Sequence, residues 1–384
     1  MHIVLATRIF APEPGAAALR LAGLATELAK RGHRVTILTS TFNSEPTWSS
    51  TGKLETRRFP ALRDKTGAVR GYVQYMSFDI PLFFRLLAVD RPDVVVCEPP
   101  PTTGVVTRIA CALRRIPYVY YAGDILSDAA AAGGMGPVVN VIRTIERIAL
   151  GKATNVIAVS PQVAARATEL GAEKTTTVPN GIATTNFRND RTRPAALPAA
   201  EGPVFLYGGT VASWLQPEIF IAAFAKLKES LPGAQLVFLG QGTAWEELKE
   251  YADRNGVTAI FHPAVSPTEA MQWYAYADVA LASLTSGSYS YAYPTKILAA
   301  LSQGTPVLYT GGGQAATDIA SADLGLVTDP DPTAVAAAMV QLGTKAAERT
   351  AADRKRLWQW VADNRSLQVS ATNAADAVLA ATTH

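Results

Sequence analysis

The sequence has few of the residues from which disulfide frameworks and zinc sites are built. Its 384 residues include two cysteines and four histidines. Two cysteines cannot form a disulfide framework or a zinc knuckle. Cys97 and Cys111 both lie in apolar runs, so we expect two buried free thiols. The histidines show no spacing typical of metal ligands or of a catalytic triad.

Long apolar runs are also absent. No stretch of about 18 uninterrupted apolar residues occurs, so we expect no transmembrane helix. The opening segment, MHIVLATRIF, is short and is interrupted by Arg8, which does not fit a signal peptide. We therefore expect a cytoplasmic protein, and contact with the inner face of the plasma membrane stays open.

Charge is present but unevenly distributed. Residues 1–190 contain 22 Lys and Arg and 15 Asp and Glu, a formal charge of +7. Residues 191–384 contain 13 and 17, a formal charge of −4. A basic first half fits an anionic partner or surface, and it equally fits an ordinary solvated surface. With 48% hydrophobic residues, the chain can bury two cores of ordinary domain size.

Short apolar runs alternate with amphipathic segments along both halves of the chain. We expect strands at residues 2–6, 34–40, 93–98, 118–124, 155–160, 204–209, 235–242, 257–262, 278–284 and 306–313. We expect helices at residues 16–32, 101–115, 138–153, 161–172, 217–231, 244–254, 267–276, 295–302, 353–364 and 366–381. This alternation predicts parallel sheets covered by helices on both faces. The polar, proline-rich segment 186–203 lacks periodicity and predicts a linker between two doubly wound domains.

Six segments, in this order along the chain, are similar to motifs of one enzyme family. They are FAPEPGAAALRLAGLATELAKRGHRVTILT, RPDVVVCEPPPTTGVV, YVYYAGDILSD, VPNGIATTNF, FLGQGTAWEEL and YPTKILAALSQGTPVL. The chain resembles the nucleotide-sugar glycosyltransferases of the GT-B fold, specifically glycosyltransferase family 4. Within that family it looks most similar to the bacterial polysaccharide branch that includes N-acetylfucosamine transferases.

The resemblance implies an α/β fold of two Rossmann-like, doubly wound parallel-sheet domains that face a central cleft. Ligands of open α/β sheets bind outside the carboxyl ends of the strands, which fits such a cleft. The implied parts are an acceptor-binding domain at 1–190, a nucleotide-sugar-binding domain at 191–365, and a C-terminal helix at 366–384 that returns to the first domain. The implied reaction is a retaining, metal-independent transfer from a UDP- or dTDP-sugar to a glycan, lipid-linked or natural-product acceptor, without a nucleic acid partner.

The resemblance and the expected strand ends together give a set of candidate site residues. For catalysis we expect Asp124 and Gly15. For the donor diphosphate we expect Lys296, Thr295, Thr210, Gly209, Arg8 and Arg20. For the nucleoside we expect Gly240, Gln241, Pro263, Ala264, Val265 and Ala299. For the donor sugar we expect Tyr291, Tyr293 and Pro294.

The sequence departs from the family's pattern at several of these places. Two glutamates that members often have eight positions apart are Tyr291 and Ala299 here. A frequent Arg and Lys pair is replaced by Thr210 and Gln216, and a histidine that often ends the strand at 118–124 is replaced by Gly123. Two alternatives therefore stay open. One is a catalytically silent homologue that binds sugar nucleotide or partners another transferase, and the other is a GT-B nucleotide-sugar epimerase.

Lys296 stands at the expected start of a helix, where the helix dipole disfavours a cation. No acidic residue lies between Pro294 and Leu308. Either a donor diphosphate binds beside Lys296, in the position that helix N-termini commonly offer to anions, or the side chain points to solvent.

The other polar candidates also have two interpretations each. Gly15 either lets a ligand approach the backbone or only forms a turn. Asp124 either orients an acceptor or donor hydroxyl or acts as a base, or it only caps the next helix. Arg8 and Arg20 either reach an anion or lie in solvent.

Two segments resemble sites of other kinds. The residues Asp329–Asp331 resemble a metal-binding acidic pair, but Pro332 follows at once, so we expect Asp331 to cap a helix. The segment Tyr72–Arg91 is aromatic and apolar with arginines at its ends. It predicts either a membrane-surface helix or a buried helix that Pro81 interrupts.

Overall fold

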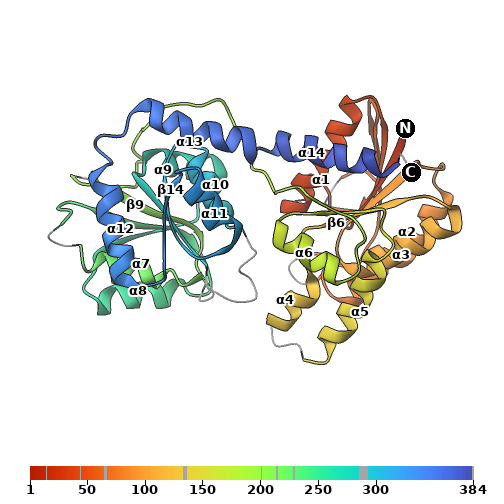
Figure 1. Ribbon diagram of the computed structural model, residues 1–384, viewed down its shortest axis with the longest axis horizontal. Coiled ribbons are helices and arrows are strands. Elements are labelled where there is room, and N and C mark those ends of the chain that lie inside the picture. The colour runs from red at the N-terminus through yellow and green to blue at the C-terminus, as the bar shows by residue number, and fades with distance from the viewer. Residues whose placement is uncertain are drawn as a thin grey trace. The chain divides into compact units, whose positions relative to one another are not determined.

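The chain folds into two compact units in the computed structural model. The structure describes residues 1–13, 15–43, 45–64, 67–132, 136–199, 201–212, 215–227, 230–284 and 293–382. The first unit comprises Met1–Ala183 and Ser366–His384, and the second comprises Thr184–Arg365 (Figure 1). The chain first passes between the units at residue 183, so the polar segment 186–203 belongs to the second unit.

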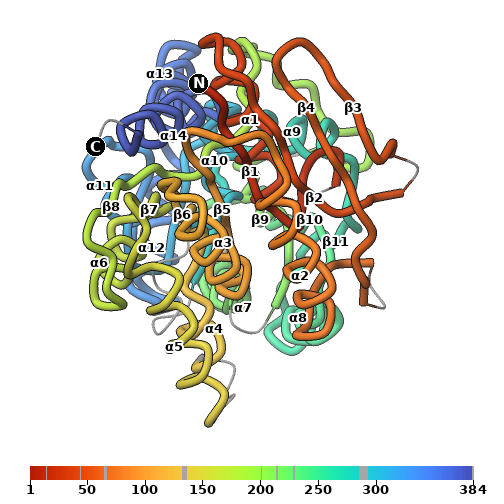
Figure 2. Tube along the Cα trace, turned by 90° about the vertical axis from the view of Figure 1, so that its right-hand side faces the viewer, coloured from red at the N-terminus to blue at the C-terminus, as the bar shows by residue number. Residues whose placement is uncertain are grey.

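An eight-stranded sheet forms the centre of the first unit. Its strands are β1 (His2–Ala6), β2 (Arg34–Ser40), β3 (Trp48–Thr51), β4 (Leu54–Phe59), β5 (Val94–Cys97), β6 (Tyr118–Ala122), β7 (Asn155–Ala158) and β8 (Thr175–Thr177). They lie in the order β3-β4-β2-β1-β5-β6-β7-β8, which Figure 2 shows from β8 across to β3. Neighbouring strands are parallel except β3 and β4, which are antiparallel.

The helices of the first unit cover this sheet. They are α1 (Ala16–Lys30), α2 (Tyr72–Ala88), α3 (Pro101–Arg114), α4 (Leu126–Ala132), α5 (Val138–Leu150), α6 (Pro161–Glu169) and α14 (Leu367–Leu379). Helix α14, from the end of the chain, packs along α1 (Figure 1). Its Ala374, Ala375 and Val378 are buried with Leu21 and Leu24 of α1 in one hydrophobic core. The end of the chain is therefore part of the first unit.

A six-stranded parallel sheet forms the centre of the second unit. Its strands are β9 (Val204–Thr210), β10 (Gln235–Gln241), β11 (Ala259–Pro263), β12 (Val279–Ser283), β13 (Val307–Thr310) and β14 (Gly325–Thr328), in the order β11-β10-β9-β12-β13-β14. Its helices are α7 (Glu218–Phe224), α8 (Trp245–Arg254), α9 (Pro267–Tyr276), α10 (Thr295–Leu301), α11 (Gly313–Ser321), α12 (Pro332–Thr344) and α13 (Ala351–Asn364). The core is rich in aromatic side chains, with Phe205, Tyr207, Phe220 and Phe238 all fully buried.

Side-chain caps fix where several helices begin. The Ser160 hydroxyl accepts a hydrogen bond from Val163 N at the start of α6, where Pro161 occupies the first helical position. The Asp331 carboxylate does the same for Ala334 N at the start of α12. Such caps satisfy backbone donors that have no partner within the helix. The helix-cap interpretation of Asp331 is therefore confirmed.

The two stretches of chain that lead from one unit to the other touch each other. Ile182 forms a β-bridge with Ser366, and Leu367 N donates a hydrogen bond to Ile182 O at 2.9 Å. A Cβ atom on Gly181 would lie 2.3 Å from Ser366 O, so the position accepts only glycine. The glycine of the segment VPNG thus permits this close contact.

Several elements differ from the sequence-based expectation. Strands β3, β4, β8 and β14 and helices α4 and α11 were not predicted, and α7 ends at Phe224 rather than near residue 231. Helix α2 runs through Pro81 without interruption. A proline removes one backbone hydrogen bond, but Phe78, Leu82 and Leu86 on the inner face of α2 are buried and hold the helix together. Within the part of the chain that the structure describes, no helix combines the length and apolarity needed to cross a bilayer.

Candidate active site

The carboxyl ends of the parallel strands in each unit gather the candidate residues. In the first unit, β1 is followed by Thr7, β5 by Glu98, and β6 by Gly123 and Asp124. Helix α1 begins at the same edge, directly after Gly15. Such an edge is where open α/β sheets bind ligands.

Arg20 lies at this edge in a fixed set of contacts. Its Nη1 donates to Asn180 Oδ1 at 3.0 Å, and its Nη2 lies 3.5 Å from Glu98 Oε2. The guanidinium also stacks 4.7 Å from the centre of the Tyr121 ring. Both Arg20 and Glu98 are buried, and Thr7 Oγ1 donates to Glu98 Oε1 at 2.6 Å. A solvent-exposed Arg20 is therefore the wrong interpretation, because the side chain is buried and its two terminal nitrogens contact Asn180 and Glu98.

Burial and charge act against each other in this cluster. Burial raises the pKa of the Glu98 carboxyl, and the positive charge of Arg20 and the hydrogen bond from Thr7 act to lower it. The pair therefore places one guanidinium at a defined position at the edge of the sheet.

Asp124 lies beside this cation and is itself exposed. Desolvation by the surrounding protein raises the pKa of Asp124, while Arg20 and Arg8 act to lower it. The backbone amides of Leu126 and Ser127 at the start of α4 donate to Glu146 Oε1, at 2.7 and 3.2 Å. The interpretation of Asp124 as the cap of the next helix is therefore wrong, because Glu146 takes that role. The Asp124 carboxylate is therefore available to contact a ligand.

Gly15 and Arg8 complete the first-unit edge. Gly15 has φ of +152° and a Cβ there would lie 3.1 Å from Ile9 Cδ1, so glycine suits this turn at the start of α1. Arg8 donates to Val69 O at 3.2 Å, and its guanidinium lies 5.5 Å from the centre of the Tyr75 ring. The contacts of Arg8 are thus internal to the first unit, like those of Arg20.

The second unit brings the donor-site candidates together at the matching edge of its own sheet. Gly240 pairs with Gly209, and Gln241 with Thr210, at the carboxyl ends of β10 and β9. Pro263, which pairs with Gly240, ends β11 and precedes Ala264 and Val265. Gly240 has φ of +153°, and a Cβ there would lie 2.0 Å from Gly209 O. Only glycine permits these backbones to approach so closely.

Lys296, in the first turn of α10, lies at this edge with its charged end buried. Its Nζ is 3.4 Å from the centre of the Tyr207 ring, and its Cε lies 3.8 Å from where a Cβ on Gly209 would be. Among the described residues, Nζ has no hydrogen-bond partner and no carboxylate within ion-pair distance. The segments 213–214 and 285–292, which the structure does not describe, contain no acidic residue. The solvent-facing interpretation of Lys296 is wrong.

The environment of Lys296 sets its protonation. Burial lowers the pKa of the Lys296 amine from 10.5 to about 7. The aromatic face of Tyr207 attracts a cation, and the Tyr207 hydroxyl donates to Thr210 O at 3.3 Å. A bound anion beside Nζ would supply the negative charge that the described residues do not, and it would favour the protonated amine.

The remaining candidates of the second unit have mixed surroundings. Ala299 is buried in α10 and offers no polar group, and Thr295 is exposed at the start of that helix. Pro294 is the N-cap residue of α10. The Arg365 guanidinium lies 4.8 Å from the centre of the Tyr293 ring, so this ring packs within the protein. Tyr291 lies outside the described residues.

Sequence reasoning missed four residues of the two edges. They are Thr7, Glu98, Asn180 and Tyr207. Glu98, Asn180 and Tyr207 contact a candidate cation, and Thr7 donates a hydrogen bond to Glu98. Glu98 had one signal, since it is an acidic residue directly after the fully apolar strand β5. The others required the packing of α1 and α10 to be known.

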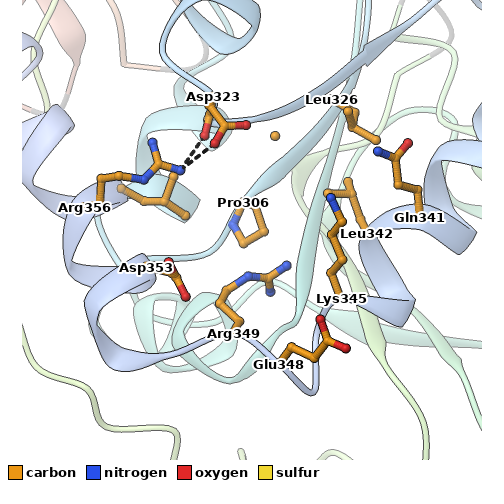
Figure 3. A pocket seen from close by; sticks show the side chains of 12 residues that line it. Pro306, Asp323, Leu326, Gln341, Leu342, Lys345, Glu348, Arg349, Asp353 and Arg356 are labelled. Atoms are coloured by element: carbon orange, nitrogen blue, oxygen red, sulfur yellow. Dashed lines mark hydrogen bonds and ion pairs between the residues drawn. The ribbon is translucent and has the colours of Figure 1, made fainter.

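A pocket of about 320 Å³ lies at the opposite edge of the second sheet, between α12 and α13 (Figure 3). Its lining includes Pro306 and Gly325, which lie where β13 and β14 begin. Both of its arginines already have structural partners. Arg356 bonds Asp323, and Arg349 donates to Asp278 O at 2.7 Å. The polarity of the strands places ligands at the other edge.

Comparisons with known proteins agree with this architecture. Residues 15–181 match the family model described as a glycosyl transferase 4-like domain, and residues 202–345 match the one described as glycosyl transferases group 1. The structure of HepE from Anabaena in complex with UDP is 18% identical, with a TM-score of 0.72 over 99% of this chain and 100% of that one. Sucrose-phosphate synthase from Thermosynechococcus elongatus is 19% identical, with a TM-score of 0.72 over 98% of each chain.

The likeness extends to a third solved structure. The catalytic domain of Starch Synthase IV from Arabidopsis thaliana, bound to ADP and acarbose, is 13% identical, with a TM-score of 0.70 over 100% of this chain and 99% of that one. No curated protein matches the chain.

These findings confirm the GT-B fold expected from the sequence, with two parallel-sheet α/β domains. The two matched family models lie in consecutive domains and together span most of the chain. The chain is a glycosyltransferase of the GT-B fold.

Proposed function

We propose that this protein is a retaining glycosyltransferase that moves a sugar from a UDP- or dTDP-sugar to a glycan, a lipid-linked intermediate or a natural product. One observation carries the donor assignment. The buried ammonium of Lys296 lies next to Gly209, and no carboxylate of the described residues lies within ion-pair distance of it. The complexes of HepE with UDP and with UDP-glucose support a uridine nucleotide donor. We also propose that the protein belongs to the bacterial polysaccharide branch that includes N-acetylfucosamine transferases.

The second unit would bind the donor. The free N–H groups of the first turn of α10 and the Lys296 ammonium would face the diphosphate, whose negative charge grows as the bond to the sugar breaks. Gly240 and Gln241, with Pro263 to Val265, would hold the nucleoside through backbone groups. Thr210 cannot supply the cation that relatives often have there, so Lys296 would be the main source of positive charge.

The first unit would bind the acceptor. In the transfer, the bond between the anomeric carbon and the diphosphate oxygen breaks, and the acceptor oxygen bonds the same carbon on the same face. Asp124 would orient the acceptor hydroxyl or accept its proton, with Arg20 and Arg8 favouring the ionised carboxylate. Gly15 would let the backbone at the start of α1 approach the reacting sugar.

We propose that the transfer needs no metal ion. The acidic pair Asp329 and Asp331 is not available as a metal motif, since Asp331 caps α12. Positive charge and backbone donors would take the part that a metal plays in other transferases. We also propose peripheral contact with the inner face of a membrane, where lipid-linked acceptors are found.

Two other functions compete with this proposal. Ala299 cannot hydrogen-bond a ribose, which favours a silent sugar-nucleotide-binding homologue over an efficient enzyme. A GT-B epimerase is disfavoured, because it needs several acid–base groups and Asp124 is the one carboxylate among the candidate residues that the structure describes.

One experiment separates the three functions. The purified protein is incubated with a panel of UDP- and dTDP-sugars and analysed by chromatography coupled to mass spectrometry. Release of nucleotide with hydrolysed or transferred sugar supports the glycosyltransferase. An isomeric nucleotide sugar would identify an epimerase, and bound nucleotide sugar that stays intact with every acceptor would identify a silent homologue.

A further inference from the structure

Three neighbouring helices of the first unit expose apolar side chains on their outer faces. Helix α3 packs between α2 and α5, as Figure 1 shows. We define the three-helix face by the large apolar side chains of these helices that are 36–71% exposed. They are Tyr72, Val73, Ile80, Phe84 and Leu87 of α2, Ile109 and Leu113 of α3, and Val138, Val141 and Ile148 of α5.

The apolar positions form stripes and are not scattered. On α2, residues 73, 80, 84 and 87 recur at helical spacing, opposite the buried Phe78, Leu82 and Leu86. On α3, Ile109 and Leu113 are one turn apart, and on α5, Val141 and Ile148 are two turns apart. A helix that is apolar on both its inner and outer faces has a second partner.

The charged side chains of these helices that are not buried are all basic, and one of them, Arg85, is turned inward with its guanidinium 3.9 Å from the centre of the Phe59 ring. The three helices contain five basic residues, Arg85, Arg108, Arg114, Arg143 and Arg147, and no lysine. They contain two acidic residues, Asp79 and Glu146, and both are buried. No carboxylate is therefore exposed on any of the three helices to balance the arginines.

We infer that the three-helix face docks on an anionic lipid bilayer surface. This inference rests on the membrane contact of the proposed function and names the surface that makes it. Apolar side chains would enter the interface between headgroups and acyl chains, and the arginines other than Arg85 would meet anionic headgroups. The aromatic Tyr72 and Phe84 suit such an interface.

The charge pattern argues against a second copy of the chain as the occupant. A symmetric dimer through this face would bring the arginines of both copies together, with no exposed carboxylate on these helices to pair with them. A bilayer that contains acidic lipid offers complementary charge and apolar depth at once. The size of the protein in solution tests the dimer alternative.

The experiment is sedimentation with vesicles of phosphatidylcholine, with and without phosphatidylglycerol, at low salt and at 0.5 M salt. We expect the protein to sediment with the acidic vesicles at low salt only, since salt screens surface charge. The double variant Arg143→Gln/Arg147→Gln should bind about 10-fold less tightly or worse. Phe84→Ser, at an exposed position, should also reduce binding. The matched control Lys249→Gln/Arg254→Gln removes two exposed charges of the second unit and should bind like the wild type.

Each sample is also tested for UDP affinity by calorimetry. Intact UDP binding without sedimentation on acidic vesicles would overturn this inference and leave the glycosyltransferase proposal standing. Equal binding to both kinds of vesicle would also overturn it, as would a stable dimer that Phe84→Ser dissociates. Absence of UDP binding in a protein that sediments would instead count against the donor site.

Discussion

The guanidinium of Arg20 occupies the space that a side chain at position 123 would need. A Cβ on Gly123 would lie 2.8 Å from Arg20 Nη2 and 3.3 Å from Nη1. Arg20 cannot easily yield, because Glu98 and Asn180 hold the same guanidinium. Relatives that this sequence resembles often have a histidine at position 123. Here glycine at position 123 leaves the space at the edge of β6 that the Arg20 guanidinium fills.

This arrangement predicts that positions 20 and 123 are energetically coupled. Gly123→Ala should displace the guanidinium and lower the free energy of unfolding. In the Arg20→Ala background the same change should cost much less, because the space is empty. The coupling should be about 1–3 kcal/mol, the range for residues in contact. Urea unfolding of the wild type, the two single variants and the double variant measures it, and additive effects would show that Arg20 moves aside freely.

Glu98 should be necessary for the stability of the buried pair. Replacing it with alanine leaves the Arg20 guanidinium buried with no carboxylate partner, which costs about 3–5 kcal/mol when a buried ion pair is broken. Glu98→Ala/Arg20→Met should recover part of that loss, since both charges are then gone. Thermal unfolding of the three proteins tests this. If Glu98→Ala is as stable as the wild type, then water already compensates the buried charge of Arg20.

Asp79 predicts a pH dependence of stability. Burial raises the pKa of this α2 carboxyl from 3.8 to about 6, with the hydrogen bond from Thr103 and the charge of Arg8 acting to lower it. The folded protein therefore holds this proton more tightly than the unfolded chain. The contribution of Asp79 to stability is fully favourable below pH 4 and is lost as the pH rises through 6.

The variant Asp79→Asn tests that sign. At pH 8 it should be more stable than the wild type by up to about 3 kcal/mol, the equivalent of two pKa units. At pH 4 the difference should largely vanish. Denaturant unfolding at both pH values decides it. A variant that is less stable at both would show that the Asp79 carboxylate is needed in its ionised form by Arg8 or by α3.

Sequence patterns predicted the fold well where a segment's own residues determine its structure. The apolar runs of β1, β5 and β9 and the capped starts of α6 and α12 follow from local sequence. The glycines of the β10 turn were assigned from their motif, and the backbone contact of Gly240 with Gly209 explains them. Local patterns failed for α2, where burial outweighed Pro81.

The candidate sites were harder to predict, because they join residues distant in the chain. Arg20 and Glu98 are 78 positions apart, and their pairing depends on how α1 packs on the sheet that contains β5. No local signal could show that Tyr207 would lie beneath Lys296. The position of Lys296 at a helix start was visible in the sequence, but its burial was not.

Lys296 gives the sharpest test of the donor site. The variant Lys296→Met keeps an unbranched chain of similar length and removes the charge. It should weaken UDP binding by about 1–3 kcal/mol, the range for a hydrogen bond to a charged group. Lys345→Met, an exposed lysine of the same unit at the other edge of the sheet, is the matched control and should bind UDP like the wild type. Calorimetry at pH 6.5 measures all three.

The pH dependence of Lys296 separates a ligand role from a structural one. Burial lowers the pKa of its amine to about 7, so the unfolded chain holds this proton more tightly between pH 7 and 10.5. The contribution of Lys296 to the stability of the free protein therefore rises with pH across that window. UDP needs the protonated amine, so its affinity should fall over the same window, and binding above pH 7 should take up a proton. Calorimetry at pH 8 in two buffers of different ionisation enthalpy measures that uptake. UDP affinity that does not change with pH in the wild type, or that survives in Lys296→Met, would leave Lys296 a structural residue over Tyr207 and would require another cation at the diphosphate.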